Sequence, residues 1–497
     1  MKKLLFLLVT GSVLVLALFL GCDNFMPPDG HNLSYSTDLE RKDVLALKHL
    51  QIPNVSEDTL ASYVMDFINI TAASETGTER SVQPAPAVAI TKTTEIIHPV
   101  ETDFAETTAD KRSARSVIGP GQIPFYVFTL ENQQTGETGF ALTCGDNRIG
   151  HVLAVAEAGN YDDDNPFLSV FYSQLNAYIE ETIGIYNSVT EADIANALNK
   201  MNENARGATA PGLPVTDVGE IEGLIPTGEH KQLKTVLWHQ YSPYNQIINN
   251  VRILPIGYEK DYQYITGCVP TAIAIIMAYH QVPGSSKALG YTHVKYDWKK
   301  MKEGNDDYAI GVLMYEIGLL KNANSNYTMG YVSQNNDKLK KGKASTSTYI
   351  NNARIAYRNM GYSDPGNFKK YEFSGIKSSI DSGKPVQVSG SVDKGMVILG
   401  IPIYKTGHSW VIDGYSQMAA TIKDKNNGDP KPSVQSDYVH CNLGWTKIAT
   451  NGWYFSGIFD IKHIPWDDSK GDIEKRSAKE DGFYQYNIQM LTDIKPK

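Results

Sequence analysis

Residues 266–280, with the sequence TGCVPTAIAIIMAYH, constrain the fold of this chain more than any other stretch. Pro270 falls in the first turn of a predicted helix, where proline is favoured, and an unbroken apolar run follows it. A helix that is apolar on every face must lie buried in the middle of a domain. Its N-terminal amides and the positive end of its dipole stabilise a thiolate. We therefore expect Cys268 to have a lowered pKa and to be a candidate nucleophile.

The helix alone leaves two interpretations of this cysteine open. A single cysteine beside an apolar run is more often a small buried hydrophobic residue than a catalyst. The catalytic interpretation depends on whether the rest of the sequence supplies a proton acceptor, a residue that orients it, and donors for a developing oxyanion.

Length and composition place the chain among globular proteins of more than one domain. A chain of 497 residues is longer than one hydrophobic core usually organises, so two domains are expected. Hydrophobic residues make up 41% and charged residues 20%, which is typical of a folded protein. The net charge of -9 argues against nucleic acid as a partner, since basic runs are limited to the N-terminus and residues 338–343.

The N-terminus has the pattern of an export signal. Two lysines precede a long apolar stretch, which ends in Leu-Gly-Cys at Cys22. This ending resembles the lipobox of bacterial lipoproteins, in which the cysteine receives the lipid. We therefore expect a signal peptide in 1–22, a tether in 23–37, and an exported body anchored by lipid to a bacterial membrane or cell surface, with release after maturation as a further step. An uncleaved membrane anchor is the alternative.

The cysteine count favours a free thiol over a disulfide framework. If Cys22 carries lipid, Cys144, Cys268 and Cys441 remain, and an odd number cannot be fully paired within the chain. At least one thiol is expected to stay free.

Residues 38–205 are predicted to form a small α+β unit. Apolar spacing predicts helices in 38–50, from Ser56, in 165–186, and from Thr190, where Asp193 approximates a capping box. Alternating patterns predict strands in 123–130, 139–144 and 152–158. The Thr-, Glu-, Ala- and Ser-rich residues 71–116 are interpreted as a flexible insertion, and residues 206–236 as a linker between two domains.

Residues 237–497 are predicted to form a second domain, with helices first and an antiparallel sheet second. Helices are expected behind Cys268 and in 311–320 and 346–360. Strands are expected in 385–390, 409–415, 437–442, 452–461 and 483–491. This order is typical of the α+β class.

Three residues of this second domain complete a catalytic arrangement around Cys268. His408 lies 140 residues downstream of Cys268 (408 minus 268), within the range of about 130 to 150 known for papain-like enzymes, and Asn442 lies further downstream. They fall on neighbouring predicted strands, which can bring the Asn442 amide beside the His408 imidazole. Gln240 and the Cys268 main-chain amide are candidate donors for an oxyanion.

These motifs together resemble the streptopain family of papain-like cysteine peptidases. The resemblance is carried by Trp238-x-Gln240-x-x-Pro243-Tyr244-Asn245, Thr266-Gly-Cys-Val, Gly407-His408-x-x-Val411-Ile412-Asp413-Gly414, and Asn442-x-Gly444-Trp445. It implies Cys268 as nucleophile, His408 as general acid/base and Gln240 in the oxyanion hole. It also implies that Asn442 and Trp445 surround the imidazole, and that Gly267 and Gly407 line or shield the substrate cleft.

The resemblance extends upstream of the cysteine domain and implies a zymogen. Residues 126–128, 139–140 and 145–148 look like the family's propeptide, which inhibits the enzyme until it is cut off. Residues 38–205 are then an intramolecular inhibitor, and the maturation site lies in 206–236. The implied partners are protein or peptide substrates and the chain's own propeptide.

The sequence departs from the family at positions near the site. Leu443 stands where the family usually has Trp, and Thr446-Lys447 stands in place of Gly-Gly. Residues 322–345 lack the family's Gly- and Ser-rich loop, and 396–405 contain extra residues. An apolar side chain one position before the residue at the scissile bond (the P2 position) is the specificity that the resemblance implies.

Two other functions remain open. One is a non-catalytic surface-binding lipoprotein on a papain-like scaffold, for which Leu443 is the best support. The other is the same Cys-His machinery acting as an amidase or transglutaminase on another amide. Asp413 is expected to have a structural role, because it lies on the same strand as His408. No paired Cys/His spacing of the zinc type exists, so neither a metal site nor a cofactor is predicted.

Overall fold

The computed structural model describes residues 40–50, 54–74, 88–99, 122–207, 218–252, 262–331, 344–392, 397–403, 406–424, 430–445, 450–460 and 488–497. The predicted signal peptide, Cys22 and the tether lie outside these residues. From Thr37 to Lys497 the chain forms one compact unit. Among the helices described, none combines the length and the apolar character that crossing a membrane requires.

The N-terminal elements match most of those predicted. They are α2 (Arg41–Lys48), α3 (Glu57–Ser74), β1 (Val88–Pro99), β2 (Gln122–Asn132), β3 (Thr138–Cys144), β4 (Val152–Ala156), α4 (Pro166–Asn187) and α5 (Glu191–Gly207). Asn165 caps α4 by accepting a hydrogen bond from the Phe167 amide at 2.9 Å. Thr190 and Asp193 form the reciprocal bonds of a capping box at the start of α5, as predicted.

The prediction of a flexible insertion in 71–116 is wrong for part of that range. Helix α3 continues to Ser74, and β1 pairs antiparallel with β2, with Ile96 opposite Phe125. The Thr, Ile and Val residues of β1 are β-branched and favour a strand once a partner strand is available. Residues 75–87 and 100–116 lie outside the described part of the chain.

The predicted linker in 206–236 also contains a strand, so the prediction of a loose connection is wrong there. Strand β5 (Val218–Gln232) pairs antiparallel with β14 (Thr406–Asp424), with Gln232 opposite Gly414. The pairing shifts register three times, and such irregularity suits a segment rich in Gly and Pro. Residues 208–217 lie outside the described residues.

The C-terminal elements follow the predicted order of helices and then strands. The helices are α6 (Gln246–Val251), α7 (Cys268–His280), α8 (Trp298–Lys302), α9 (Asp307–Gly318), α11 (Asn352–Asn359), α12 (Phe373–Asp381) and the 3-10 helix η1 (Ser456–Ile458). The main strands are β11 (Val386–Val392), β14, β15 (Pro430–Asn442), β16 (Gly452–Phe455) and β17 (Gln489–Leu491). The short strands are β6 (Tyr262–Gln263), β7 (Asn326–Thr328), β8 (Gly330–Tyr331), β9 (Ser345–Ser347), β10 (Lys369–Lys370), β12 (Val397–Ile398) and β13 (Ile401–Pro402).

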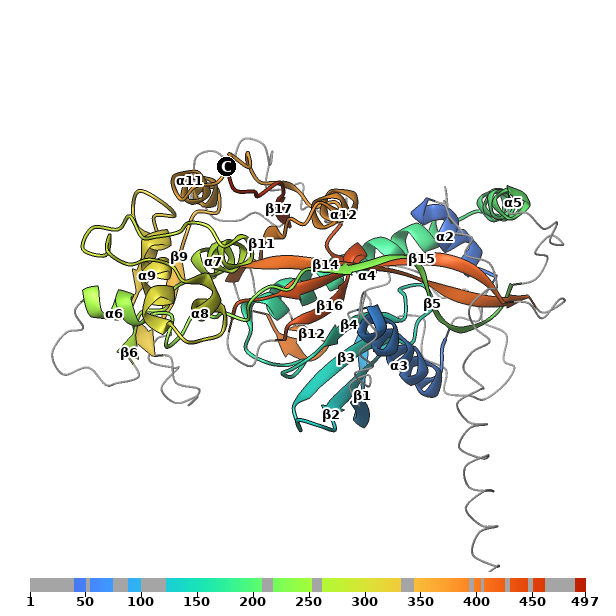
Figure 1. Cartoon of the computed structure of the whole chain (residues 1–497). Coiled ribbons are helices and arrows are strands. Elements are labelled where there is room, and N and C mark those ends of the chain that lie inside the picture. The colour runs from blue at the N-terminus through green and yellow to red at the C-terminus, as the bar shows by residue number, and fades with distance from the viewer. Residues whose placement is uncertain are drawn as a thin grey trace, which may run out of the picture. The chain divides into compact units, whose positions relative to one another are not determined.

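One antiparallel sheet runs through both predicted domains (Figure 1). Its order is β1-β2-β3-β4-β16-β15-β14-β11-β17-β10, and β5 also pairs with β14. The N-terminal strands join the C-terminal strands at β4 and β16, where Val155 lies opposite Trp453. Gly452 has φ 155, and a Cβ there would lie 2.2 Å from the Val155 carbonyl oxygen, so glycine is needed at this junction. The α+β class is confirmed.

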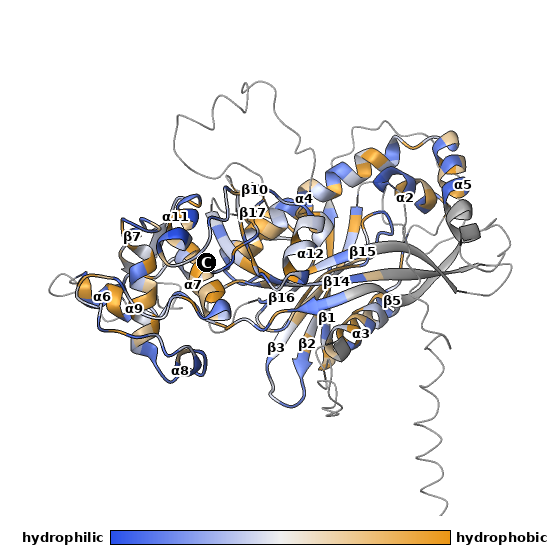
Figure 2. Ribbon diagram, turned by 45° about the horizontal axis from the view of Figure 1, so that its top comes forward, coloured by the Kyte–Doolittle hydropathy of each residue, from blue (hydrophilic) through white to orange (hydrophobic). Residues whose placement is uncertain are grey.

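Two hydrophobic cores flank the region in which the candidate residues lie. In the first, α4 packs on the sheet, and Phe167 contacts Trp410 and Tyr454 edge-on at 5.0 and 4.8 Å between ring centroids. The second surrounds α7, whose residues from Val269 to Ala278 are all buried. Figure 2 shows α7 and α9 as mainly hydrophobic helices. The prediction of a central buried helix behind Cys268 is confirmed.

Candidate active site

Cys268 is the first residue of α7, and the turn before it has room only for glycine. Gly267 is the N-cap, with φ 92, and a Cβ there would lie 2.8 Å from Cγ2 of Thr346. The Gly267 carbonyl accepts hydrogen bonds from the amide of Thr271 at 3.1 Å and from its hydroxyl at 2.8 Å. Cys268 is partly exposed, whereas the residues on both sides of it are buried. Cys268 is therefore held at the helix N-terminus, with part of the residue still exposed.

The pKa of Cys268 differs from the prediction. Burial raises the pKa of the thiol, and hydrogen bonds from the main-chain amides of Ser409, Val269 and Cys268 only partly offset this, so the net pKa lies above its ordinary value. The helix N-terminus acts in the predicted direction, but it does not outweigh burial. In this structure the cysteine is a neutral thiol at pH 7.

His408 lies near the start of β14, opposite Gly390 of β11, and is 1% exposed. Its Nε2 donates to the main-chain carbonyl of Leu443 at 2.7 Å, which fixes the proton on Nε2. Its Nδ1 is buried and has no hydrogen-bond partner. Burial lowers the pKa of His408 to about 4, and the hydrogen bond to Leu443 opposes this only in part. The imidazole is therefore neutral at pH 7, with a free lone pair on Nδ1.

Aromatic side chains surround this imidazole. Trp410 lies nearly parallel to the His408 ring, at 6.3 Å between centroids and 8° between planes. Trp445 contacts the ring edge-on at 5.8 Å and also contacts Tyr241, beside Gln240, at 6.1 Å. The structure thus places Trp445 against the histidine, where the resemblance implied that it would be.

The predicted contact between Asn442 and His408 is not formed. Its Nδ2 donates to the Thr235 hydroxyl at 2.9 Å and to the Val236 carbonyl at 3.0 Å, while its Oδ1 is buried without a partner. Strands β14 and β15 are neighbours, but Asn442 lies opposite Val411, three residues beyond the histidine. Adjacency of the two strands was predicted correctly, and their register accounts for the missing contact.

Gln240 supplies a buried donor that has no partner. It is 1% exposed, and its Nε2 makes no hydrogen bond. Its main-chain carbonyl accepts from the Thr266 amide at 3.1 Å, which ties its loop to the turn before Cys268. A buried donor left open is unfavourable unless a ligand or water satisfies it. This is the property that an oxyanion hole requires.

The loop from Leu443 to Trp445 lies over α7. Leu443 is 1% exposed, and its amide donates to the Asn451 side chain at 2.8 Å. Gly444 has φ 56, and a Cβ there would lie 2.9 Å from Cγ2 of Thr271. Gly407, the other predicted cleft residue, lies opposite Ser391 at the start of β14. The predicted cleft and shielding residues therefore lie on the elements that hold Cys268 and His408.

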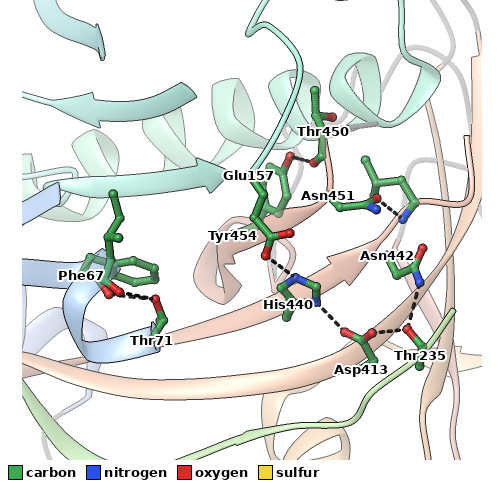
Figure 3. Close-up of polar contacts among 12 residues, drawn as sticks. Phe67, Thr71, Glu157, Thr235, Asp413, His440, Asn442, Thr450, Asn451 and Tyr454 are labelled. Carbon is green, nitrogen blue, oxygen red and sulfur yellow. Dashed lines mark hydrogen bonds and ion pairs between the residues drawn. The ribbon is translucent and has the colours of Figure 1, made fainter. Parts of the chain in front are cut away.

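Sequence reasoning missed a second polar group beside the site (Figure 3). Nδ1 of His440 and Oδ1 of Asp413 lie 2.6 Å apart, and Nε2 of His440 and Oε1 of Glu157 lie 3.2 Å apart. The Thr235 hydroxyl donates to the other oxygen of Asp413 and accepts from Asn442. Asp413 was expected to have a structural role. The sequence pattern that could have predicted the Asp413–His440 pair is an Asp in a buried strand followed by a His in the next strand.

The cysteines and the histidines show no arrangement for a metal in the described residues. Cys144, Cys268 and Cys441 are all free thiols, which agrees with the prediction that at least one would be unpaired. No group of three His, Cys, Asp or Glu side chains there could hold an ion.

The match to one family model agrees with this chemistry. Residues 238–454 match the model of the peptidase C10 family. Among solved structures, the chain is similar to a mutant prointerpain A fragment from Prevotella intermedia, at 17% identity and a TM-score of 0.40, with 75% of this chain and 96% of that chain covered. It is also similar to the active wild-type interpain A cysteine protease of that organism, at 20% identity and a TM-score of 0.28, with 45% and 84% covered. A search of curated proteins finds no match.

Proposed function

We propose that the chain is the zymogen of an exported cysteine endopeptidase, because residues 238–454 match the model of the peptidase C10 family. Cys268 is its nucleophile, His408 its general acid/base, and Gln240 its oxyanion donor. One observation carries these assignments best. The buried, unpartnered Nε2 of Gln240 and the unpartnered Nδ1 of His408 are the two groups that a substrate and a thiol would satisfy.

The reaction follows from these groups. The Cys268 thiol transfers its proton to Nδ1 of His408, and the sulfur attacks the carbonyl carbon of the scissile peptide bond. Nε2 of Gln240 and the Cys268 amide donate to the developing oxyanion. The imidazolium returns the proton to the leaving amine as the C–N bond breaks, which gives the acyl-enzyme. Water then attacks the thioester, His408 takes a proton from it, and the freed thiol completes the cycle.

The state of the active site supports a latent enzyme. A thiol with a raised pKa and an imidazole with a pKa of about 4 do not form a thiolate–imidazolium pair at pH 7. Neither nitrogen of His408 bonds to Cys268 in the described structure. The N-terminal part also reaches the histidine through packing, because Phe167 of α4 contacts Trp410, and Trp410 lies parallel to His408. We infer that removal of residues N-terminal to the cysteine domain changes these surroundings.

The maturation cut lies in 206–236, and the contacts of this segment narrow the range. The Leu233 amide donates to the Asp413 carbonyl at 2.7 Å, and the Thr235 hydroxyl contacts Asp413 and Asn442. A cut after Thr235 would remove both contacts from the cysteine domain. We therefore place the cut N-terminal to Leu233.

Location and specificity are part of the same proposal. The signal-like residues 1–22, which end at Cys22, support export and lipid anchoring. An apolar side chain at the P2 position of the substrate is proposed from the family resemblance. The exported location also suits an enzyme that is made latent and cut later.

The test compares full chains that carry Cys22→Ser, so that they receive no lipid at this position. Each is incubated under reducing conditions, and chain mass and casein cleavage are followed with and without an epoxide thiol inhibitor. A Cys268→Ala copy is the inactive control, and a Cys144→Ala copy is the matched control, because Cys144 is buried in the N-terminal part. Processing between residues 206 and 233 with inhibitor-sensitive proteolysis, lost only in the Cys268→Ala copy, supports the self-maturing peptidase.

If no chain processes itself, cleavage of the linker by an added protease separates the remaining possibilities. Casein cleavage after that cut means that another protease performs the maturation. A chain that cleaves no casein after the cut, and whose Cys268 does not react with the epoxide, would contradict the proposal and favour the surface-binding protein. Release of ammonia without chain cleavage would favour the amidase or transglutaminase.

A further inference from the structure

Arg252 is an exposed cation that two tyrosines hold near Cys268, and the reaction steps above do not use it. It is the C-cap of α6, and its amide donates to the Ile248 carbonyl at 2.9 Å. Its guanidinium carbon lies 4.5 Å from the centre of the Tyr327 ring and 5.7 Å from that of Tyr264. We propose that Arg252 forms a subsite that binds an acidic side chain of the substrate peptide. This rests on the proposed function, which makes a peptide the substrate.

Strand pairing places Tyr327 beside the turn that holds Cys268. Tyr327 of β7 lies directly opposite Thr346 of β9, and opposite residues of an antiparallel pair share one face of the sheet. The Thr346 hydroxyl donates to the Ile265 carbonyl at 2.7 Å. Its Cβ lies 2.9 Å from the position that a Cβ on Gly267 would take, and Gly267 directly precedes the nucleophile. The Tyr327 side chain therefore faces the segment that leads into Cys268.

Tyr264, the second tyrosine, belongs to that same segment and lies four residues before Cys268. Its amide donates to Oδ1 of Asn249 at 2.8 Å, and its carbonyl accepts from Nδ2 of Asn245 and of Asn249 at 2.8 and 3.0 Å. Its ring contacts Tyr327 edge-on at 6.5 Å between centroids. An extended peptide advances about 3.3 Å per residue. A substrate residue a few positions from the scissile bond therefore reaches this group.

The Tyr327 ring is itself held in place by its surroundings. It is partly buried, whereas Asn326 and Thr328 on either side of it are exposed. Gly318 ends α9, and a Cβ there would overlap the Tyr327 hydroxyl, so glycine leaves room for the ring. A guanidinium over an aromatic ring is attracted by the negative face of that ring. Arg252 is therefore oriented before any ligand binds.

The guanidinium of Arg252 is open to a carboxylate ligand. Other arginines in the described part of the chain pair with a carboxylate, namely Arg41, Arg148, Arg354 and Arg358. No such pair involves Arg252 within the described residues. A guanidinium binds a carboxylate through two parallel hydrogen bonds, and a fork that is already oriented loses less entropy on binding. Asp or Glu in the substrate supplies the carboxylate that fits this group.

The test measures kcat/KM of full chains with Cys22→Ser after the cut in 206–236, with active sites titrated by the epoxide. The substrates are fluorogenic peptides with an apolar P2 residue, and matched peptides carry Asp, Asn or Lys at one other position on either side of the scissile bond. The variants are Arg252→Gln, Arg252→Lys and Arg252→Glu. Arg354→Gln is the matched control, because Arg354 is a partly exposed arginine that already pairs with Asp364.

We expect one position at which the parent cleaves the Asp peptide with a kcat/KM about tenfold above that of the Asn peptide. Arg252→Gln should remove this preference by slowing cleavage of the Asp peptide alone, and Arg252→Lys should keep part of it. Arg252→Glu should favour the Lys peptide at the same position. Cleavage of the Asn peptide should stay near the parent value in all variants, and Arg354→Gln should match the parent throughout.

Three results would overturn the acidic subsite while leaving the peptidase in place. The first is equal cleavage of Asp and Asn peptides by the parent at every position. The second is a preference for Asp that Arg252→Gln retains. The third is an equal loss on Asp and Asn peptides in Arg252→Gln, which would mean that Arg252 only stabilises this segment. A parent that cleaves none of the peptides, and whose Cys268 does not react with the epoxide, would overturn the proposed function and the subsite with it.

Discussion

Nε2 of His408 donates to the main-chain carbonyl of Leu443, 2.7 Å away, and not to the side chain of Asn442. The proton on Nε2 leaves Nδ1 as the acceptor for the Cys268 thiol, which is the tautomer that the reaction needs. A main-chain carbonyl therefore performs in this structure the orienting role that the sequence assigned to an amide. The hydrogen bond from His408 to Leu443 is also independent of the identity of the Leu443 side chain.

This bond predicts unequal effects at the two residues. Asn442→Ala should lower kcat by no more than about tenfold, because the Leu443 carbonyl still holds the imidazole, whereas His408→Ala should lower it at least about a thousandfold. Steady-state kinetics on the matured chains measure both. Equal losses in the two variants would show that Leu443 gives the imidazole no support.

Gln240 is predicted to matter for rate and little for stability. Gln240→Ala removes a donor that has no partner in the free enzyme, so kcat should fall about a hundred- to a thousandfold while the melting temperature stays near that of the parent. Gln387→Ala is the matched control, because this buried side chain bonds to both Tyr357 and Ser409. The control should melt at a lower temperature. A lower melting temperature in Gln240→Ala with unchanged kcat would refute the oxyanion role.

His408 predicts a loss of stability in acid. Its pKa is about 4 in the fold and about 6.5 in the unfolded chain, so the unfolded chain binds the proton first as the pH falls. The stability is complete above pH 6.5 and is lost as the pH falls from 6.5 toward 4. At pH 5 the loss from this one residue is about 2 kcal/mol.

Denaturant unfolding of the parent and of His408→Gln, each at pH 7 and pH 5, measures this contribution. Gln can still donate to the Leu443 carbonyl but does not titrate. The variant should lose less stability between the two pH values than the parent does, with other buried histidines such as His151 contributing equally to both. An identical pH dependence in both chains would contradict a buried, neutral His408.

The contact between Glu157 and His440 predicts a small effect on docking of the N-terminal part. The Glu157 carboxylate is 56% exposed, so Glu157→Gln should weaken docking by no more than about 1 kcal/mol. Amide hydrogen exchange of the paired strands β4 and β16 in the Cys268→Ala chain measures it. Glu137→Gln, at an exposed turn, is the control and should leave the exchange unchanged. Loss of the pairing altogether in Glu157→Gln would mean that this ion pair, and not the shared core, holds the two parts together.

Short stretches of the sequence correctly predicted those parts of the fold and site that depend only on residues close together in the chain. The apolar run behind Cys268 is buried as a central helix, and α7 begins at Cys268, with Pro270 in its first turn as predicted. Strand patterns likewise placed His408 and Asn442 on neighbouring strands. The Thr190–Asp193 capping box followed from residue types alone.

Features that depend on distant partners could not be predicted in this way. Strands β1 and β5 are stable because β2 and β14 pair with them, and this pairing cannot be predicted from the two segments alone. The register between β14 and β15 depends on the bulge at Asp413, which no residue type announces. The pKa of Cys268 was misjudged because burial by the surrounding chain outweighs the helix N-terminus.

The central claim is that Cys268 is the nucleophile of a peptidase that the N-terminal part keeps latent. The most direct measurement treats the full chain with the epoxide before and after the cut in 206–236, and maps the adduct by mass spectrometry. The account predicts little adduct before the cut, and rapid modification of Cys268 alone after it, which a His408→Ala chain should fail to show. Equally fast modification before the cut, or modification only at Cys144 or Cys441 after it, would contradict the account.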